Sequence, residues 1–441
     1  MKSLTTIKKN KNVLRRLLGR ETLGKASTSF SNASITNKFQ NFCLRDSFDT
    51  HDPKASELRL SFLKKRSKII EIVAAKDVIF ALTAAGTCVA FKRSCKQQNH
   101  RLCFLNTSPF EVIRSLFYNK TNNSIITVSV YKGDNFSSLV CRSTSVEYIK
   151  RGEPSAGFQL FESESLKYPG FVEFDDVNGK VLTFSASEKV YKIWDLKNYQ
   201  PLYSITDELV HEIKISPGIM LLIYQKSADG GHVPLKVIDI ENGSVLQSLK
   251  QPLHRTRKID FIEQFNEKLL IKQEGEPLQI VDIRNGERLE IPATKFLTPS
   301  AFIFLYEVQL FLAFRHRHIA VWNFRGEMVT QFEDHTLWNT DCNTNNIYIT
   351  SHQASKRDLI ISYCKPTRCS DTDYNPAQGC IHVSNIVDGR SLARIQPGIG
   401  LQQQQQQQQL ALNDVTSLFY NEEYNEIYTG NKDGHLHVWS N

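Results

Sequence analysis

The sequence predicts an all-β fold, a single closed β-propeller in which four-stranded units repeat around a ring. The first observation is the phrase Val190-Tyr-Lys-Ile-Trp194-Asp195, which recurs in degraded form along the chain. Its Asp-like positions fall at residues 195, 239, 282, 323, 385 and 440, with gaps of 44, 43, 41, 62 and 55 residues. The second observation is that Asn-Gly or Asp-Gly turns follow several copies. A period near 40–45 residues with this ending is typical of propeller blades.

The strands can be assigned in chain order from short β-rich runs between turn signals. Two degenerate blades fit residues 68–106 and 111–162, with third strands at 88–91 and 139–142. The next four blades are clearer, and their strands are predicted at 171–174, 180–184, 190–196 and 201–205; 212–215, 220–224, 235–240 and 245–249; 258–261, 268–271, 278–283 and 288–291; and 301–305, 310–314, 319–324 and 328–332. The seventh blade is predicted at 346–350, 359–364, 381–386 and 391–395.

The end of the chain predicts how the ring closes. Residues 415–419, 426–429 and 436–439 supply three strands, and a blade needs four. The strand-like run 57–63 precedes the first full blade, so we expect it to complete the last one and remove the open sheet edges. This gives eight blades; seven is the alternative if residues 68–165 hold one blade with insertions.

The flanking and inserted segments have a different composition. Residues 1–55 are rich in Ser, Thr, Asn and Lys and are predicted to be a basic disordered tail, which leaves 56–441 for the propeller. Loop insertions are expected at 365–379 and 396–412, and the second contains eight consecutive glutamines, 402–409. A homopolymer of glutamine cannot bury a core, so this insertion is predicted to be a disordered loop.

Charge is concentrated at the start of the chain. The net charge is +8, and residues 1–50 hold ten Lys or Arg against three Asp or Glu. The propeller is therefore nearly neutral, and direct nucleic-acid binding is not expected. The basic cluster 8–20 is interpreted as a nuclear import signal, an organelle transit peptide or a solvated tail. We expect a nuclear or cytoplasmic protein, or one present in both.

Neither cysteines nor apolar runs indicate secretion or a membrane. Nine irregularly spaced cysteines without an apolar signal sequence predict reduced thiols. The longest apolar stretch, 296–314, is interrupted by Pro299, Glu307 and Gln309, so it is interpreted as two buried strands with a turn near Glu307.

Three endings carry a resemblance to a known family. Lys192-Ile-Trp194-Asp195, Ala320-Val-Trp322-Asn323 and Asp433-Gly-His-Leu-His-Val-Trp439 look like third-strand endings of WD-repeat β-propellers. The chain resembles divergent, plant-type members over roughly residues 57–441. It departs from the family in lacking the Gly-His pair that opens such repeats, so the hydrogen-bonded tetrad is not expected in most blades. The resemblance implies a scaffold role and no catalytic residues.

Motifs for catalysis or cofactor binding are not found. The sequence has no Gly-rich phosphate loop, no Gly-x-Ser-x-Gly elbow and no His-Glu-x-x-His. Cys364, Cys369 and Cys380 with His382 lack the paired short spacing of structural zinc sites, and Arg315 and Arg317 flank the His316/His318 pair. We therefore expect no cofactor, no metal and no enzymatic activity.

The predicted function is a non-enzymatic scaffold that binds proteins or peptide segments, since loops on rigid scaffolds are where binding residues gather. A substrate receptor of a cullin-type ubiquitin ligase is one alternative, because Val281-Asp282-Ile-Arg284 keeps the Asp and Arg of the Trp-Asp-x-Arg ending that such receptors share. An enzyme with its site in the channel is the other. Partner-binding residues are expected at Arg284 and, in the link after the sixth blade, at His335, Trp338 and Asp341.

Overall fold

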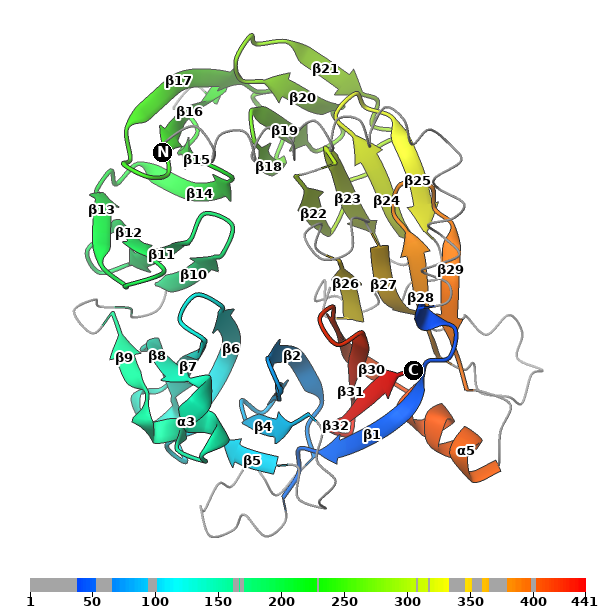
Figure 1. The fold of residues 1–441 in the computed structure, drawn as a ribbon. Helices are drawn as coiled ribbons and strands as arrows, with labels where there is room; N and C mark the ends of the chain where they lie inside the picture. Colours follow the sequence, from blue (N-terminus) through cyan, green and yellow to red (C-terminus); the bar gives the residue numbers. More distant parts are fainter. Residues whose placement is uncertain are drawn as a thin grey trace, which may run out of the picture.

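The ring predicted from the repeat is present. The computed structural model describes residues 38–52, 66–93, 101–161, 166, 170–227, 230–306, 308–315, 318–332, 346–350, 359–364, 379–397 and 402–441. Within these residues, eight four-stranded antiparallel sheets follow one another around a closed β-propeller (Figure 1). This confirms eight blades rather than seven.

In each of the first seven blades the chain runs outward through four consecutive strands. Blades 1 and 2 contain β2 (Ile69–Ala75), β3 (Val78–Thr83), β4 (Cys88–Lys92) and β5 (Arg101–Phe104), then β6 (Glu111–Asn119), β7 (Ser124–Tyr131), β8 (Val140–Ser145) and β9 (Phe158–Leu160). Blades 3 and 4 contain β10 (Phe171–Asp175), β11 (Lys180–Ser185), β12 (Val190–Asp195) and β13 (Pro201–Ile205), then β14 (Val210–Ser216), β15 (Ile219–Tyr224), β16 (His232–Asp239) and β17 (Val245–Pro252).

The remaining blades follow the same order. Blades 5 and 6 contain β18 (Ile259–Phe265), β19 (Lys268–Gln273), β20 (Leu278–Asp282) and β21 (Arg288–Ile291), then β22 (Ala301–Leu305), β23 (Leu310–Arg315), β24 (His318–Asn323) and β25 (Met328–Phe332). Blade 7 contains β26 (Ile347–Ile349), β27 (Leu359–Cys364), β28 (Cys380–Asn385) and β29 (Ser391–Ile395). Strands β22 and β23 account for the apolar stretch 296–314, and no described helix is long and apolar enough to cross a membrane.

Blade 8 is closed by a strand from the start of the chain. Its inner strands are β30 (Val415–Asn421), β31 (Glu426–Asn431) and β32 (His435–Ser440), and its outer strand is β1 (Cys43–Asp49). Strand β1 pairs antiparallel with β32, from Cys43 opposite Ser440 to Asp49 opposite His435. Closure by an early strand is therefore confirmed.

The choice of closing strand was wrong. Residues 43–49, which lie within the predicted tail 1–55, form the closing strand, and the predicted run 57–63 lies outside the described residues. Strand β1 carries one fully buried aromatic side chain: Phe48 stacks on Phe91 of blade 1 with ring centroids 5.2 Å apart, while Leu44 is only half-buried against the core between blades 7 and 8. One such side chain amid charged neighbours gives too faint an alternation to be detected by hydrophobic periodicity.

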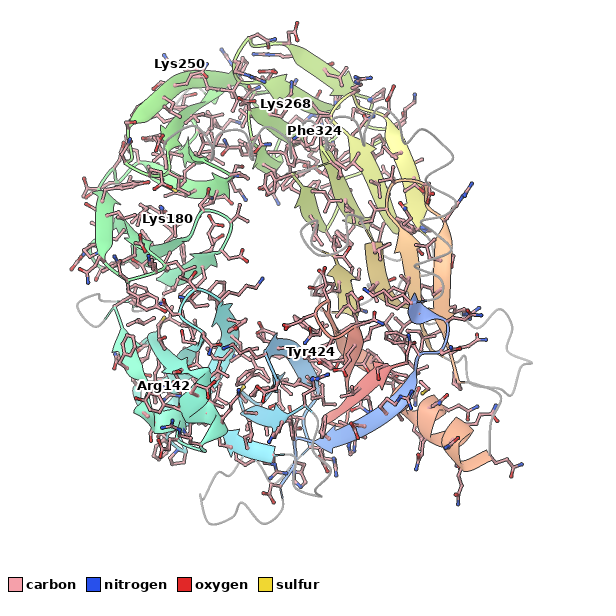
Figure 2. The ribbon with its side chains drawn as sticks, in the orientation of Figure 1. Arg142, Lys180, Lys250, Lys268, Phe324 and Tyr424 are labelled. Atoms are coloured by element: carbon pink, nitrogen blue, oxygen red, sulfur yellow. The ribbon has the colours of Figure 1, made fainter. Side chains whose placement is uncertain are left out.

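The core lies between the blades. Eight clusters of buried apolar side chains are found among the described residues, and each joins two neighbouring blades around the ring. In the cluster between blades 5 and 6, for example, Phe324 stacks on Phe265 with centroids 4.3 Å apart (Figure 2). Each blade therefore needs both neighbours to bury its two faces, which is why the ring must close.

The recurring phrase has a structural explanation in the turn that follows it. The side-chain oxygen Oδ1 of Asp195 accepts hydrogen bonds from the backbone N–H groups of Lys197 (2.6 Å) and Asn198 (3.3 Å). The same capping recurs at four further copies, Asp239, Asp282, Asn323 and Asn385. Four residues after Asp239 the chain needs a left-handed residue, and Gly243 supplies it with φ +71°. The Asp-like position is thus kept because it stabilises the third-to-fourth-strand turn.

The tryptophan of the phrase also has a defined partner in two blades. Trp194 Nε1 donates to Thr183 Oγ1 and Trp439 Nε1 donates to Thr429 Oγ1, both at 2.9 Å and buried. In blade 6, Ala313 occupies the position of these threonines, two residues beyond the partner of Trp322 in the register. This buried hydrogen bond is therefore shared by blades 3 and 8, whereas the alanine in blade 6 offers no such acceptor.

The glutamine tract does not form the disordered loop expected from its composition. Residues Gln402–Ala411 form helix α5, which lies outside the ring beside blade 8 (Figure 1). Glutamine has a good intrinsic helix propensity. Ala411 and Leu412 at the end of the helix are fully buried between blades 7 and 8 and tether it there.

The antiparallel path gives the ring two different faces. Turns between first and second strands, and between third and fourth strands, lie on one face, here called the hairpin face. Turns between second and third strands and the links between blades lie on the other, here called the linker face. Helix α5 belongs to a link, the one between blades 7 and 8.

Candidate functional site

An acidic cleft lies on the inner wall of the ring. It has a volume of about 510 Å³ and is lined mainly by the inner strands β10, β14 and β18, with Phe304 from β22. In Figure 1 these strands lie nearest the centre of the ring. The cleft therefore spans blades 3 to 6 and is built from strands rather than loops. We call it the channel cleft.

Three carboxylates and one lysine form its charged lining: Glu173, Glu212, Glu263 and Lys214. Lys214 Nζ lies 2.7 Å from Glu212 Oε1 and 2.9 Å from Glu263 Oε1. Glu212 and Lys214 are two residues apart on β14, so they project from the same side of the strand. Glu263 comes from the neighbouring blade, and the lysine thus links β14 to β18.

The electrostatics of the channel cleft favour a positively charged ligand. Burial opposes the charged form of Lys214, but Glu263 and Glu212 outweigh it, so the pKa of Lys214 is raised. The pKa of Glu173 is also raised, first by burial and then by the nearby Asp175. One ammonium group faces three carboxylates, which leaves an excess of negative charge for a cation to neutralise.

A buried amide adds an unused acceptor. Gln264 is 2% exposed, and its Nε2 donates to the carbonyl of Asn266 at 3.1 Å. Because that carbonyl requires a donor, the orientation of the amide is fixed and Oε1 is the remaining atom. Gln264 Oε1 is buried and has no hydrogen-bond partner among the described residues. An unsatisfied buried acceptor fits a ligand that donates hydrogen bonds.

Aromatic rings border the acidic groups. Phe171 is 37% exposed, and its ring centroid lies 6.2 Å from that of Tyr191; both line the cleft, as does Phe304. Aromatic faces attract Lys and Arg side chains, and they also pack against the apolar stems of these residues. The channel cleft therefore combines acceptors, negative charge and aromatic surface.

Of the four partner-binding residues predicted from sequence, the structure describes only Arg284, which does not line the channel cleft. Arg284 is on the hairpin face, in the turn after β20, where its Nη2 lies 2.8 Å from Glu267 Oε2 and its side chain is 67% exposed. His335, Trp338 and Asp341 lie outside the described residues. Phe332, the last described residue before them, ends strand β25, and Asn346, the first described residue after them, precedes β26.

The cysteine and histidine group on blade 7 does not assemble a described metal site. Cys364 and Cys380 are buried opposite each other on β27 and β28, and Cys380 Sγ lies 3.1 Å from His382 Nε2. Cys369 lies outside the described residues. Within the described part of the chain, no group of three His, Cys, Asp or Glu side chains could hold a metal ion.

Sequence reasoning missed the channel cleft for a physical reason. Its residues come from four blades, and no short motif joins them. The available signal was the polar pair Glu212-x-Lys214 on an innermost strand, because a lysine two residues from a glutamate shares its face of the strand. That signal does not show that Glu263, 49 residues beyond Lys214, completes the group.

Solved structures with similar folds share little sequence with this chain. The computationally designed Ika8 protein is 17% identical with a TM-score of 0.44, and the match covers 85% of this chain and 97% of Ika8. BamB from Moraxella catarrhalis is 14% identical with a TM-score of 0.41, and the match covers 91% of this chain and 98% of BamB. No curated protein matches the sequence. The family model that does match, over residues 27–439, is described as Domain of unknown function (DUF7899), and the chain belongs to that family.

Proposed function

We propose that the protein is a non-enzymatic interaction scaffold that binds a basic segment of a partner protein in the channel cleft. The observation that carries the proposal is the acceptor-rich lining. Glu173, Glu212 and Glu263 outnumber Lys214, and Gln264 Oε1 has no hydrogen-bond partner in the part of the chain that the structure describes. A Lys or Arg side chain supplies the missing positive charge and donors.

The resemblance to WD-repeat propellers supports the same role. It rests on the Trp-Asp endings and on the buried hydrogen bonds from Trp194 to Thr183 and from Trp439 to Thr429. We infer that the chain is a divergent relative of those propellers, which act as rigid platforms for protein segments. The closed ring supplies such a platform, because each blade is fixed by both neighbours.

The test is peptide binding in solution. Fluorescently labelled peptides of about ten residues, with a central Lys or Arg between neutral residues, are titrated with the full chain and followed by anisotropy. Their uncharged counterparts carry norleucine or citrulline at the central position. We expect saturable binding of the basic peptides only, with affinity that falls as salt rises because charge attraction is screened.

Two variants assign binding to the channel cleft. E173Q removes the carboxylate that is not in contact with Lys214, and we expect affinity to fall by about tenfold, as for loss of one charge contact. The control E188Q/E208Q/E287Q removes three exposed carboxylates outside the cleft and should bind like the wild type. Equal binding by E173Q and wild type, or equal binding of basic and neutral peptides, would refute the proposal.

An enzyme with its site in the channel remains a second candidate, and the raised pKa of Glu173 is the observation that favours it. A carboxyl group whose pKa is raised in a cleft can act as an acid or a base. Turnover of a substrate that is abolished by E173Q, while the folded state is retained, would favour this candidate over the scaffold.

A further inference from the structure

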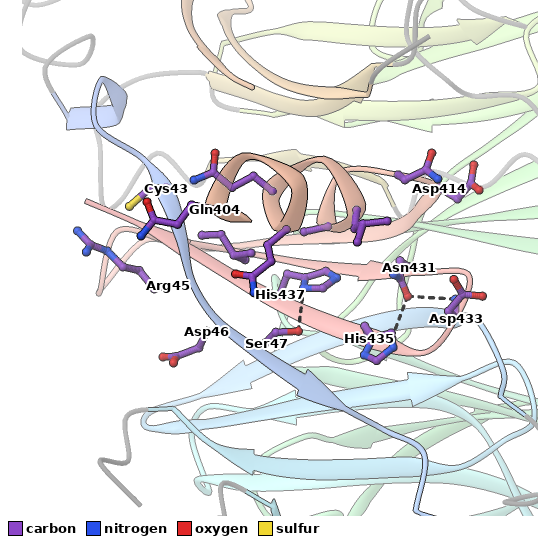
Figure 3. A pocket seen from close by; sticks show the side chains of 16 residues that line it. Cys43, Arg45, Asp46, Ser47, Gln404, Asp414, Asn431, Asp433, His435 and His437 are labelled. Carbon is purple, nitrogen blue, oxygen red and sulfur yellow. Dashed lines mark hydrogen bonds between the residues drawn. The ribbon is translucent and has the colours of Figure 1, made fainter. Parts of the chain in front are cut away.

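A second cleft lies beside the closing blade (Figure 3). It has a volume of about 730 Å³ and is bounded by β1, by the β31–β32 hairpin and by helix α5. Gln404, Gln407 and Gln408 of the helix line one side. We call it the closure cleft. It is formed by elements of blade 8 and the link before it, and it is separate from the channel cleft.

A buried histidine with an unused nitrogen lines the closure cleft. His437 is 7% exposed, and its Nδ1 lies 3.1 Å from the hydroxyl of Ser47 on β1 (Figure 3). Its other ring nitrogen, Nε2, is buried and has no hydrogen-bond partner among the described residues. Burial, with a smaller contribution from His435, lowers the pKa of His437 to about 4, so the ring is neutral near pH 7. A buried polar atom of this kind fits an occupant of the cleft that can hydrogen-bond to it.

The five blades from blade 3 to blade 7 bury the equivalent position less than blade 8 does. The position two residues before the Trp-like residue of the phrase holds Lys192, Lys236, Gln279, Ala320 and His382 in blades 3 to 7. All five side chains are only half-buried, whereas His437 is buried. The difference is helix α5, which lies over this part of blade 8 (Figure 3). The helix thus converts a solvent-facing repeat position into an enclosed one.

The chemistry of the lining selects among ligands. Amide groups of glutamine and asparagine both donate and accept hydrogen bonds, and the neutral imidazole offers one more polar atom. Asp46, Asp414 and Asp433 outnumber Arg45, so anions such as phosphate esters are disfavoured. The apolar lining is confined to Leu44, Leu410, Ala411 and the thiol of Cys43, which is too little for a lipid or an aromatic drug-like molecule.

We propose that the closure cleft binds a small uncharged polyol of the size of a mono- or disaccharide. Closely spaced hydroxyl groups each donate and accept a hydrogen bond, which matches a lining of amides, carboxylates and one imidazole. The volume lies in the range of small-molecule sites. The ligand bridges α5 and β32, and its hydroxyl group completes the hydrogen bonding of His437 Nε2.

The experiment follows the imidazole nitrogens of the full chain by NMR, with ¹⁵N-labelled histidine. Glucose, maltose and myo-inositol are the probes. We expect a saturable shift of the His437 Nε2 resonance with at least one of them, while His318, which is exposed on blade 6, stays unchanged. The variant H437F is expected to lose binding at least tenfold, and H318Q to bind like the wild type.

A second variant keeps the test decisive if H437F does not fold. Gln404 and Gln407 are exposed on α5, so Q404A/Q407A leaves the core intact and should weaken polyol binding severalfold. Three outcomes would overturn the proposal. The first is no saturable shift with any of the probes, which means that water alone occupies the cleft. The second is a shift with spermidine but not with polyols, which means a cation site, and the third is unchanged polyol binding by both variants.

Discussion

Blades 3 and 8 share the repeat but differ in how they are completed. Both bury a tryptophan whose Nε1 donates to a threonine at 2.9 Å. Both pack apolar side chains against two neighbours. In blade 3 the fourth strand follows directly after the turn capped by Asp195. In blade 8 the phrase ends at Ser440, and the fourth strand is β1, nearly four hundred residues away in sequence.

The difference shows which properties belong to the repeat and which to its surroundings. The recurring phrase forms the third strand of its blade, and in both blades it places a buried tryptophan in a hydrogen bond with a threonine of the second strand. Position 192 in blade 3 is half-buried, but its counterpart His437 is enclosed because α5 and β1 are present. Elements outside the repeat therefore decide which repeat positions become sites. The following predictions test this comparison, from the largest effect to the smallest.

Removing β1, the strand from the start of the chain that completes blade 8, should have the largest effect on stability. Deletion of residues 1–50 removes β1 with its buried Phe48, exposes the edge of β32 and uncovers part of the core shared with blade 1. We expect loss of the cooperative melt and aggregation, measured by circular dichroism and light scattering. Deletion of residues 1–37 removes none of the described strands and should melt like the full chain. Indistinguishable melts of the two deletions would contradict the assignment of β1.

Acid should destabilise blade 8 through His437. The pKa of His437 in the folded state, about 4, lies below the ordinary histidine value of 6.5, so the folded state disfavours the protonated ring. Stability is complete above pH 6.5 and falls as pH decreases toward 4, because only the unfolded chain then binds the proton. The expected loss is roughly 3 kcal/mol over that range, from about 1.4 kcal/mol per pKa unit.

Denaturant titrations at several pH values measure this loss. His435, Asp433, Asp46 and Arg45 line the same cleft as His437, so the comparison is made with H437N, which keeps all four. The free energy of unfolding of H437N should change less between pH 6.5 and 4 than that of the wild type. A substitution of Lys192 in blade 3 should leave the pH dependence of the free energy of unfolding unchanged. An identical slope for wild type and H437N would rule out His437 as the source.

Removing the tryptophan's acceptor should affect both blades alike. T183V and T429V replace a buried hydroxyl by a methyl group of similar size and leave the indole N–H without its partner. Each should lower the free energy of unfolding by about 1–3 kcal/mol, the cost of a buried unsatisfied donor. In the double variant W439F/T429V the two changes should be less than additive, as a denaturant-based double-mutant cycle can show. If only one of the two variants lowered the free energy of unfolding, the tryptophan–threonine hydrogen bond would not have the same role in blades 3 and 8.

The smallest effect on stability is expected at the last position of the phrase, which is Asp195 in blade 3 and Ser440 in blade 8. D195A removes the carboxylate that accepts from the N–H groups of Lys197 and Asn198, and should cost about 1 kcal/mol, the usual net value of such hydrogen bonds. Ser440 occupies the same repeat position, but the strand beside β32 is β1 from the start of the chain, so S440A removes no cap of a turn between the third and fourth strands and should change stability by less than ~0.5 kcal/mol. Equal losses would mean that the position acts through something other than the turn.

The sequence by itself determined the architecture. The six Asp-like positions, their spacing and the Asn-Gly and Asp-Gly turns marked six blades, because a strand ending and its turn are local features that a sequence carries residue by residue. The two degenerate blades at 68–106 and 111–162 brought the predicted count to eight, with seven as the alternative. It also determined that an early strand closes the ring, since three C-terminal strands leave a blade incomplete. It did not identify β1, whose single buried aromatic residue gives little periodic signal.

The tertiary structure decided the sites. Glu173, Glu212, Glu263 and Gln264 meet only because four blades converge on one wall, and His437 is enclosed only because α5 lies across it. The glutamine tract forms that helix because Ala411 and Leu412 are anchored between blades 7 and 8, a contact that composition does not show. Distances between residues of different blades depend on the closed ring as a whole, so no local pattern in the sequence could have supplied them.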